Sequence, residues 1–264
     1  MTGTPEVPYF PVHIMELDRL GKKTLGEGTG IQEVDHPQFR DKEYMKRRDE
    51  IAALGINYSM KDPTLPYLEY NDLEKQVWKT CYEKLMPLME KHACEECLYT
   101  LGEMEKHCGF KSSNIPQLED ISRYIMKATG WRLKPVGGLL SQREFLNGLA
   151  FRTFHSTQYI RHHSKPFYTP EPDIVHELFG HAAMFAHKNF AEFSQQIGLA
   201  SLGADEAEIA RLGAIYWFTI EFGQCLEKGE RKSYGAGINS SVDEILNAVS
   251  DKPKILPLDC KLIA

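Results

Sequence analysis

Apolar residues recur three or four positions apart along most of the chain, which is the spacing of one face of an α-helix. The clearest run begins after Asn71, a residue type that commonly caps a first helical turn, and continues to about residue 93. The same spacing predicts further helices over about 41–54, 95–107, 117–129, 142–154, 173–185, 189–201 and 205–228. We therefore expect a mainly α protein.

Strand patterns are few. The stretch 132–141 is expected to form a loop or a short extended segment, and short strands are expected near 254–258. No stretch alternates strand and helix, so a doubly wound parallel sheet is not expected. The first sixty residues are polar and interrupted by glycine and proline, which indicates an irregular arm with short helices. The pattern predicts one domain over residues 1–264, made of packed helices with a few short strands.

The composition narrows the class of protein. Of the 264 residues, 42% are hydrophobic and 26% are charged, which is typical of a globular domain. A net charge of −6 provides no basic footprint for nucleic acid, and no apolar stretch is long enough to cross a membrane. The N-terminus lacks the features of a secretory signal, so we expect a cytoplasmic protein whose six cysteines are reduced.

The motif PEPDIVHELFGH places His176 and His181 five positions apart, with Glu177 after the first histidine. The HExxH motif of zinc proteases needs the two histidines four apart, on one helix face. On a straight α-helix, a step of five residues turns the side chain by about 140°. Both histidines can bind one metal only if the helix bends or begins here, which Gly180 would allow. The spacing argues against a zinc protease but leaves a two-histidine metal site open.

A third ligand is expected on another element. Glu221 lies in the run IYWFTIEFG, among aromatic and aliphatic residues, where an isolated carboxylate would be costly to bury. A metal would explain it, because two histidines and one carboxylate form the facial triad of non-heme iron oxygenases. The alternative is a glutamate at the solvent-exposed edge of a half-buried helix. Phe218 and Phe222 of the same run are expected to be core residues.

Several strings together resemble the pterin-dependent aromatic amino acid hydroxylases, the family that acts on phenylalanine, tyrosine and tryptophan. The most specific are KPFYTPEPDIVHELFGH (165–181) and IYWFTIEFG (215–223), and YGAGINSS (234–241) also matches. Further matching strings occupy 36–44, 108–122, 130–162 and 190–204. The resemblance runs from about residue 8 to 258. It implies a single catalytic domain with its iron site in a central cleft.

The resemblance also implies roles for individual residues. Ferrous iron would be bound by His176, His181 and Glu221. Arg161 would bind the carboxylate of the amino acid substrate and Asp173 would hold Arg161 in place. The other residues implied on the substrate side are Thr169, Pro172, Trp217, Ser240 and His155.

A reduced pterin would bind beside the iron. Phe145 would stack on the pterin ring, and Glu177 would accept its hydrogen bonds through water. The remaining pterin-side residues implied by the family are Gly138, Leu139, Leu140, Gly213 and Tyr216. Two positions depart from the pattern of animal phenylalanine-specific members, because Gln142 replaces a serine and Gly213 replaces an alanine.

The implied reaction is the para-hydroxylation of L-phenylalanine to L-tyrosine, with O₂ and a tetrahydropterin as co-substrates. Leu139, Trp217, His155 and Tyr168 favour phenylalanine over the other aromatic amino acids. Tryptophan hydroxylation by the same family is one alternative. A zinc-dependent hydrolase with Glu177 as base is an alternative from another class, opposed by the histidine spacing, and a non-catalytic fragment is a third.

The family's regulatory domain and heptad tetramerisation helix have no counterpart in this sequence. We therefore expect this chain to be a monomer or a weak dimer, and a tetramer stays open for a longer protein. The motif Cys94-x-x-Cys97, with His107 and Cys108, fits no common zinc module and lacks the neighbouring βαβ pattern of redox motifs, so packing is its expected role. The run GEGTG (26–30) is no nucleotide loop and matches a mobile loop of the family.

Overall fold

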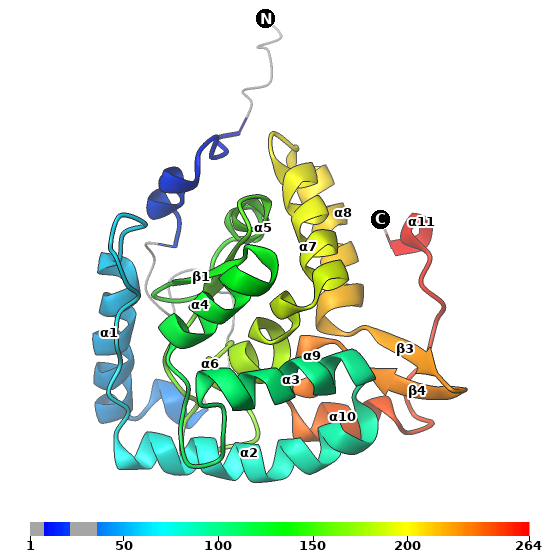
Figure 1. The fold of residues 1–264 in the computed structure, drawn as a ribbon, viewed down its shortest axis with the longest axis horizontal. Helices are drawn as coiled ribbons and strands as arrows, with labels where there is room; N and C mark the ends of the chain where they lie inside the picture. Colours follow the sequence, from blue (N-terminus) through cyan, green and yellow to red (C-terminus); the bar gives the residue numbers. More distant parts are fainter. Residues whose placement is uncertain (1–7, 22–35, 264) are drawn as a thin grey trace, which may run out of the picture.

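Helices dominate the computed structural model, which describes residues 8–21 and 36–263 (Figure 1). The GEGTG run therefore lies outside the described residues. The α-helices are α1 (Lys42–Asn57), α2 (Asp72–His92), α3 (Glu95–Cys108), α4 (Leu118–Thr129), α5 (Gln142–Ala150), α6 (Ile174–His176), α7 (Lys188–Ser201), α8 (Glu206–Tyr216), α9 (Ala236–Asn239), α10 (Val242–Ala248) and α11 (Cys260–Ile263). The mainly α prediction is confirmed.

Short 3₁₀- and π-helices fill the gaps between these elements. The 3₁₀-helices are η1 (Ile14–Arg19), η2 (Pro37–Phe39) and η4 (Met184–Ala186), and the π-helices are η3 (Glu177–Ala182) and η5 (Trp217–Glu221). Among the described residues, no helix is long and apolar enough to cross a membrane.

Local sequence explains where the long helices begin and end. Asn71 accepts from the backbone N–H of Glu74, so it caps α2 as predicted, and the Glu74 side chain accepts from the backbone N–H of Asn71, which completes a capping box. Gly130 ends α4 in the left-handed conformation, with φ of 78°, which glycine adopts at little cost.

The strands form two small sheets. β1 (Arg132–Pro135) pairs in parallel with β2 (Thr153–Ser156), with α5 as the crossover. β3 (Gln224–Glu227) pairs with β4 (Glu230–Ser233) as an antiparallel hairpin. The described residues thus hold one βαβ unit, which the sequence pattern did not reveal, because a four-residue strand is too short to show alternation.

Two expected helix ends and one expected strand are wrong. The helix expected over 142–154 ends at Ala150, because Arg152 has a φ of 50° and leads the chain into β2. The helix expected over 205–228 ends at Glu221, because Gly223 lies against Thr219 and Tyr234, where no side chain fits, and the chain turns into β3. Residues 254–258 form no strand. They are exposed and pair with no other strand among the described residues, and Pro257 has no N–H to donate to a neighbouring strand.

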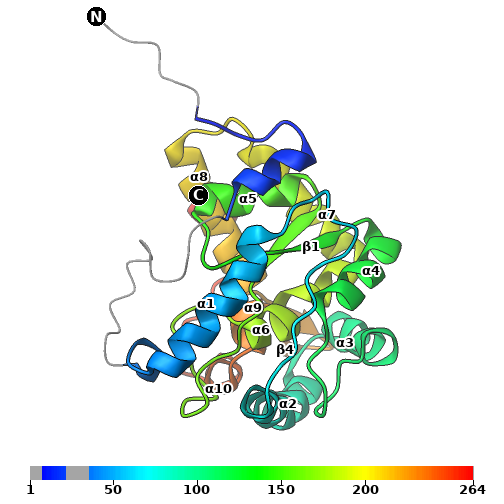
Figure 2. The same ribbon diagram turned by 90° about the vertical axis from the view of Figure 1, so that its left-hand side faces the viewer.

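The core joins these elements into one domain. α2 lies along the base in the view of Figure 1, with α3 above it, while α7 and α8 stand side by side to the right of the centre and β3, β4 and α11 lie at the edge opposite α1. Figure 2 shows α1 crossing the near face of the molecule in front of α6 and α9. Trp78, Phe110 and Phe179 are buried and pack ring against ring, and Phe179 belongs to the π-helix η3. Phe185, which follows η3, is also buried and packs against Trp131 and Phe154. This aromatic core holds the segment that carries both histidines.

Candidate metal centre and active-site cavity

His176 and His181 lie on one face of a helix because that helix changes type between them. α6 ends at His176 and continues as the π-helix η3, whose hydrogen bonds span five residues rather than four. Residues five apart therefore project to the same side, and the two Nε2 atoms are 3.0 Å apart. The wider helical turn, rather than a bend at Gly180, resolves the five-residue spacing.

Gly180 has a different role from the one expected. A Cβ at this position would lie 2.9 Å from both the Cα and the carbonyl oxygen of Ala236 in α9. Glycine thus allows the backbones of η3 and α9 to touch, and α9 leads directly to Ser240.

Glu221 completes a group of three ligand-type side chains. It is the last residue of the second π-helix, η5, which continues α8. Its Oε1 is 3.0 Å from the Nε2 of His181, and its Oε2 is 3.7 Å from the Nε2 of His176. One ligand atom from each residue lies within 4.8 Å of the others. Two imidazole nitrogens and one carboxylate oxygen are the donor set of a facial triad that suits ferrous iron.

The electrostatics of this group favour a bound cation. Burial alone would raise the pKa of Glu221, but His181, His176 and the backbone N–H of Gly237 together outweigh burial and lower the pKa to about 2. Burial lowers the pKa of His176 to about 4. Burial opposes charge on His181 as well, but Glu221 raises the pKa of that imidazole. At neutral pH the site therefore offers an ionised carboxylate and a neutral imidazole, the forms that bind metals.

Neighbouring hydroxyls orient the two imidazoles. The Oγ of Ser240 lies 2.9 Å from the Nδ1 of His176. The phenolic oxygen of Tyr216 lies 3.5 Å from the Nδ1 of His181, at the limit of a hydrogen bond. These contacts leave both Nε2 atoms free to face Glu221, which is how ligand histidines are usually held. Ser240, expected on the substrate side, thus contacts a ligand directly.

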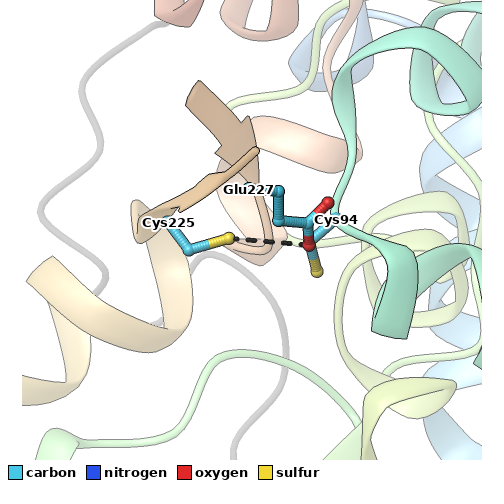
Figure 3. Close-up of side chains that lie close together, drawn as sticks. All are labelled: Cys94, Cys225 and Glu227. Carbon is cyan, nitrogen blue, oxygen red and sulfur yellow. Dashed lines mark hydrogen bonds between the residues drawn. The ribbon is translucent and has the colours of Figure 1, made fainter. Parts of the chain in front are cut away.

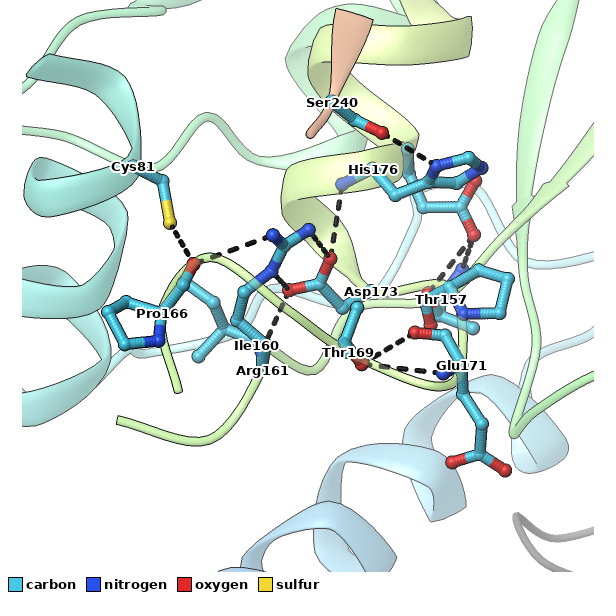
Figure 4. Close-up of polar contacts among 12 residues, drawn as sticks. Cys81, Thr157, Ile160, Arg161, Pro166, Thr169, Glu171, Asp173, His176 and Ser240 are labelled. Carbon is cyan, nitrogen blue, oxygen red and sulfur yellow. Dashed lines mark hydrogen bonds and ion pairs between the residues drawn. The ribbon is translucent and has the colours of Figure 1, made fainter. Parts of the chain in front are cut away.

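Arg161 and Asp173 form a buried, two-pronged ion pair (Figure 4). The Nε of Arg161 donates to Oδ2 of Asp173 at 2.9 Å, and Nη2 donates to Oδ1 at 2.7 Å. Asp173 also accepts from the backbone N–H of His176 at 3.1 Å, as the N-cap of α6. One carboxylate therefore fixes both the guanidinium and the start of the histidine-bearing helix.

The predicted residues converge on one cavity of about 700 Å³. Every residue expected at the metal, the substrate or the pterin lines it except Asp173, which lies behind Arg161. The volume is within the usual range for small-molecule sites. The lining residues expected on the pterin side are Gly138, Leu139, Leu140, Phe145, Glu177, Gly213 and Tyr216, and those expected on the substrate side are His155, Arg161, Thr169, Pro172, Trp217 and Ser240.

The aromatic side chains around the cavity differ in how far they are exposed to solvent. Phe145 packs edge-on against Tyr216, with ring centroids 5.1 Å apart. Trp217 is half exposed and lies against Phe222 at 4.8 Å. Phe218 points to solvent and is 55% exposed, so its expected place in the core is wrong. The widened turn of η5 carries Glu221 inward, and it leaves Phe218 outside.

Burial shifts the pKa of two further titratable side chains that line the cavity, Glu177 and His155. Glu177 accepts from the backbone N–H and the hydroxyl of Thr157, at 3.1 and 3.0 Å, and burial raises its pKa to about 7. His155 is fully buried, and neither ring nitrogen finds a hydrogen-bond partner among the described residues. Burial, helped by Lys134, lowers the pKa of His155 to about 3, so this ring is neutral.

Sequence reasoning missed two features of the cavity. It did not find Thr157, and no signal marked this residue, because the strand β2 that precedes it was not predicted. It treated Gln142 and Gly213 as separate departures, yet a Cβ on Gly213 would lie 1.6 Å from the amide nitrogen of Gln142. The missing methyl group of one residue makes room for the longer side chain of the other. Thr169, in contrast, is tied to its own loop by donating to the carbonyl of Glu171 at 2.7 Å.

Comparison with known proteins gives consistent results. The family model described as biopterin-dependent aromatic amino acid hydroxylase matches residues 8–264. A phenylalanine-4-hydroxylase of Rattus norvegicus is 52% identical over 98% of this chain, which spans 56% of that relative's length.

Solved structures agree. The phenylalanine hydroxylase of Chromobacterium violaceum with bound oxidised Fe(III) superposes with a TM-score of 0.72 at 29% identity, over 83% of this chain and 78% of the other. The same enzyme with bound iron(III) and oxidised 7,8-dihydrobiopterin gives 0.69 at 28% identity, over the same shares. Because the family model spans nearly the whole chain, the protein belongs to the biopterin-dependent aromatic amino acid hydroxylases.

Proposed function

We propose that residues 1–264 form a catalytic domain that hydroxylates L-phenylalanine to L-tyrosine at the para carbon, with ferrous iron, a tetrahydropterin and O₂. One observation carries the proposal: two π-helices bring His176, His181 and Glu221 together in a cavity that also exposes the Arg161 guanidinium. The relatives named above carry the same activity in their names, and this chain spans about half of the rat protein's length.

His176, His181 and Glu221 would hold the iron, which together with the reduced pterin supplies the activation of O₂. The chain's own contribution is to position the groups and exclude water. Three protein ligands leave further coordination positions for small molecules. Ser240 keeps the His176 ring turned towards the metal by contacting its Nδ1.

Arg161 would bind the carboxylate of the amino acid. Asp173 engages Nε and Nη2 of Arg161, and Nη1 donates to the carbonyl of Pro166 at 3.5 Å, so a second carboxylate would meet the remaining N–H groups of Nη1 and Nη2. Asp173 keeps the guanidinium charged and fixed, since it outweighs burial and raises the pKa of Arg161. Pro172, Trp217 and Phe222 offer an apolar wall to a bare aromatic ring.

The pterin would lie on the opposite wall. Phe145 presents a ring face for stacking, and Gly138–Leu140 line the cavity beside it. Glu177 has one oxygen engaged by Thr157, and its other oxygen can receive hydrogen bonds from a pterin through water. With a pKa near 7, Glu177 can also hold a proton next to the metal site.

Phenylalanine is the proposed substrate, ahead of tryptophan. In an apolar cavity the hydroxyl of tyrosine would lose hydrogen bonds with water, at a cost of about 1–3 kcal/mol unless it found a partner. Tryptophan would be a poorer substrate for a different reason, because its larger ring system fits the cavity less well. The zinc hydrolase alternative is disfavoured by family membership and by a π-helix in place of the HExxH geometry.

The test is turnover of the three amino acids in parallel, after anaerobic loading with Fe(II) and with one tetrahydropterin. We expect the highest kcat/KM for phenylalanine, a lower value for tryptophan and the lowest for tyrosine. A tyrosine value equal to that of phenylalanine would overturn the substrate assignment. Hydrolysis with zinc and no need for pterin would overturn the whole proposal.

We also propose a cytoplasmic location and a monomer or weak dimer for this chain. The acidic net charge is consistent with a partner set restricted to small molecules, without nucleic acid or membrane. Light scattering at micromolar concentration tests the assembly, and a stable tetramer would contradict it.

A further inference from the structure

Three cysteines gather at the start of α3, outside the cavity of the metal centre. Cys94 is the N-cap of α3 and Cys97 is the third residue of that helix. Their sulfurs are 3.3 Å apart and share a hydrogen bond. Cys225 of β3 approaches from the other side, with Glu227 beside it (Figure 3). The Cys94-x-x-Cys97 motif therefore has both thiols in contact at a helix N-terminus.

We propose that Cys94 and Cys97 are a redox-active dithiol, which a small hydroperoxide closes to a disulfide. The two sulfurs are already within about 1.3 Å of the separation of a disulfide bond, which is about 2.0 Å. Both thiols belong to one turn of chain, so a small change in side-chain rotation brings them together. The dithiol chemistry does not depend on the proposed hydroxylase activity, whereas the expected effect on Fe(II) binding rests on the proposed metal site.

The surroundings divide the roles of the two thiols. The hydrogen bond shared with Cys97 lowers the pKa of Cys94, and the N-terminal end of α3 favours negative charge there. The same hydrogen bond, together with burial, raises the pKa of Cys97 well above its ordinary value. Cys94 is therefore the nucleophile, and Cys97 is the protonated partner.

The site admits only a small oxidant. Cys94 is 3% exposed and is covered by β3, one strand of the hairpin, whose Cys225 and Glu227 are only partly buried. Glu227 is engaged, because its Oε1 accepts from the backbone N–H of Glu95 at 3.0 Å. Burial raises the pKa of Cys225 to about 11, so Cys225 does not compete as a nucleophile.

The proposed reaction balances with one hydroperoxide. The Cys94 thiolate attacks one oxygen of hydrogen peroxide, the O–O bond breaks, and the hydroxide that leaves takes a proton to become water. Cys94 is then a sulfenic acid. The Cys97 sulfur attacks the Cys94 sulfur and loses its proton, and the hydroxyl leaves as a second water. Two thiols have lost two electrons and two protons, and the peroxide has been reduced to two waters.

The dithiol contacts the segments that carry the metal ligands. The Cys97 sulfur lies 3.4 Å from the sulfur of Met184 in η4, which follows η3. It also accepts from the amide of Asn239 at 3.6 Å, and the next residue, Ser240, contacts His176. Closing the disulfide draws this sulfur towards Cys94. We therefore expect the oxidised chain to bind Fe(II) more weakly than the reduced chain.

The test uses the full chain with a chelator present, so that no iron reacts with the peroxide. After exposure to hydrogen peroxide and alkylation of free thiols, peptide mapping should find Cys94 linked to Cys97, and a dithiol reductant should reverse the link. In Cys97→Ser, the sulfenic acid on Cys94 should persist and be captured by dimedone added together with a denaturant, after the peroxide has been removed. Cys108→Ser is the matched control, because Cys108 is buried in the same helix, and it should leave the link unchanged.

Three results would overturn the inference. One is that all thiols of the chain stay free at a peroxide concentration that oxidises a small-molecule dithiol in a parallel control. Another is a Cys94–Cys225 link that replaces the Cys94–Cys97 link and disappears in Cys225→Ser. The third concerns the coupling: an Fe(II) affinity that is equal in oxidised and reduced chains, measured after the peroxide and the chelator have been removed.

Discussion

Single residues in the cavity are coupled in ways that their own identities do not show. Gly213 and Gln142 come from α8 and α5, and the side chain of Gln142 occupies the space that a Cβ on Gly213 would fill. An amide thus stands at the wall where the family pattern expects a hydroxyl and a methyl group. The pair should be tested together.

We expect Gly213→Ala to disturb the pterin and to leave the fold intact. The new methyl group meets the far end of an exposed, flexible side chain, so Gln142 must move into the cavity, while alanine favours the helix by about 1 kcal/mol. The KM for tetrahydropterin should rise, and Gln142→Ser should reverse the rise in the double variant. A double-mutant cycle should give a coupling of roughly 0.5–3 kcal/mol, as for side chains in contact. Strictly additive effects would show that the two residues act independently.

His155 should give the protein a measurable acid sensitivity. In the folded chain its pKa is lowered from 6.5 to about 3, so below pH 6.5 the unfolded chain binds a proton that the folded chain does not. The free energy of unfolding contributed by this residue is fully present above pH 6.5 and falls by about 1.4 kcal/mol per pH unit as the pH drops towards 3. In urea unfolding measured at several pH values, the free energy of unfolding of His155→Gln should depend on pH below 6.5 with a slope smaller by the equivalent of one proton. Exposed His107→Gln is the control, and a slope unchanged in His155→Gln would show that its ring is protonated when folded.

Arg161→Lys should weaken amino acid binding more than pterin binding. Lysine keeps the charge but loses the planar fork that engages Asp173 twice, so the cation no longer sits fixed in the cavity. Loss of a charged hydrogen bond costs about 1.5–3 kcal/mol, which predicts a KM for phenylalanine about tenfold higher or more. Arg47→Lys is the matched control, since Arg47 grips Glu74 with two similar hydrogen bonds outside the cavity. An unchanged KM in Arg161→Lys would mean that the carboxylate is bound elsewhere.

At the scale of elements, the candidate metal centre depends on two π-helices and on the packing of η3 against α9. The sequence predicted helices over both segments, because hydrophobic spacing was strong there. It could not predict their π character, since no hydrophobic period distinguishes a short π-helix from an α-helix. The one available signal was chemical: two histidines five apart cannot share a metal on an α-helix. The sequence also did not predict the early end of α5 or the end of η5 at Glu221. The positive φ of Arg152 and the close contacts of Gly223 override local helix propensity at these two points.

Gly180→Ala should separate η3 from α9. The new Cβ would meet the backbone of Ala236, which cannot turn aside as a side chain can, and overpacking of this kind typically costs about 1–3 kcal/mol. Because α9 positions Ser240 beside His176, we also expect weaker Fe(II) binding.

Gly102→Ala provides the comparison for Gly180→Ala. A Cβ at Gly102, inside α3, meets nothing within 4 Å, so alanine should stabilise the chain by up to about 1 kcal/mol without changing Fe(II) binding. Thermal unfolding and iron titration of both variants check the pair. If Gly180→Ala had the same stability and the same iron affinity as the parent chain, the close approach of the η3 and α9 backbones would be unnecessary.

For the whole molecule, composition and helical spacing predicted a single, mainly α domain, and the motifs predicted which residues line the cavity. The roles of these residues stay predictions until they are tested on the loaded protein. Most of the candidate site could be predicted from the sequence because it lies in short motifs with definite chemistry. The Gln142–Gly213 pair and the Thr157–Glu177 hydrogen bonds could not be predicted, because each joins segments that only the fold brings together.

The most direct test of the account is the number of ferrous ions bound per chain after anaerobic equilibration. The account predicts one for the parent chain and a large loss in His176→Ala, His181→Ala and Glu221→Ala alike, because two remaining ligands hold iron loosely. Glu227→Ala, from the second group of ligand-type side chains, is the control and should keep its iron. Full iron binding in any of the three ligand variants, or its loss in Glu227→Ala alone, would contradict the account.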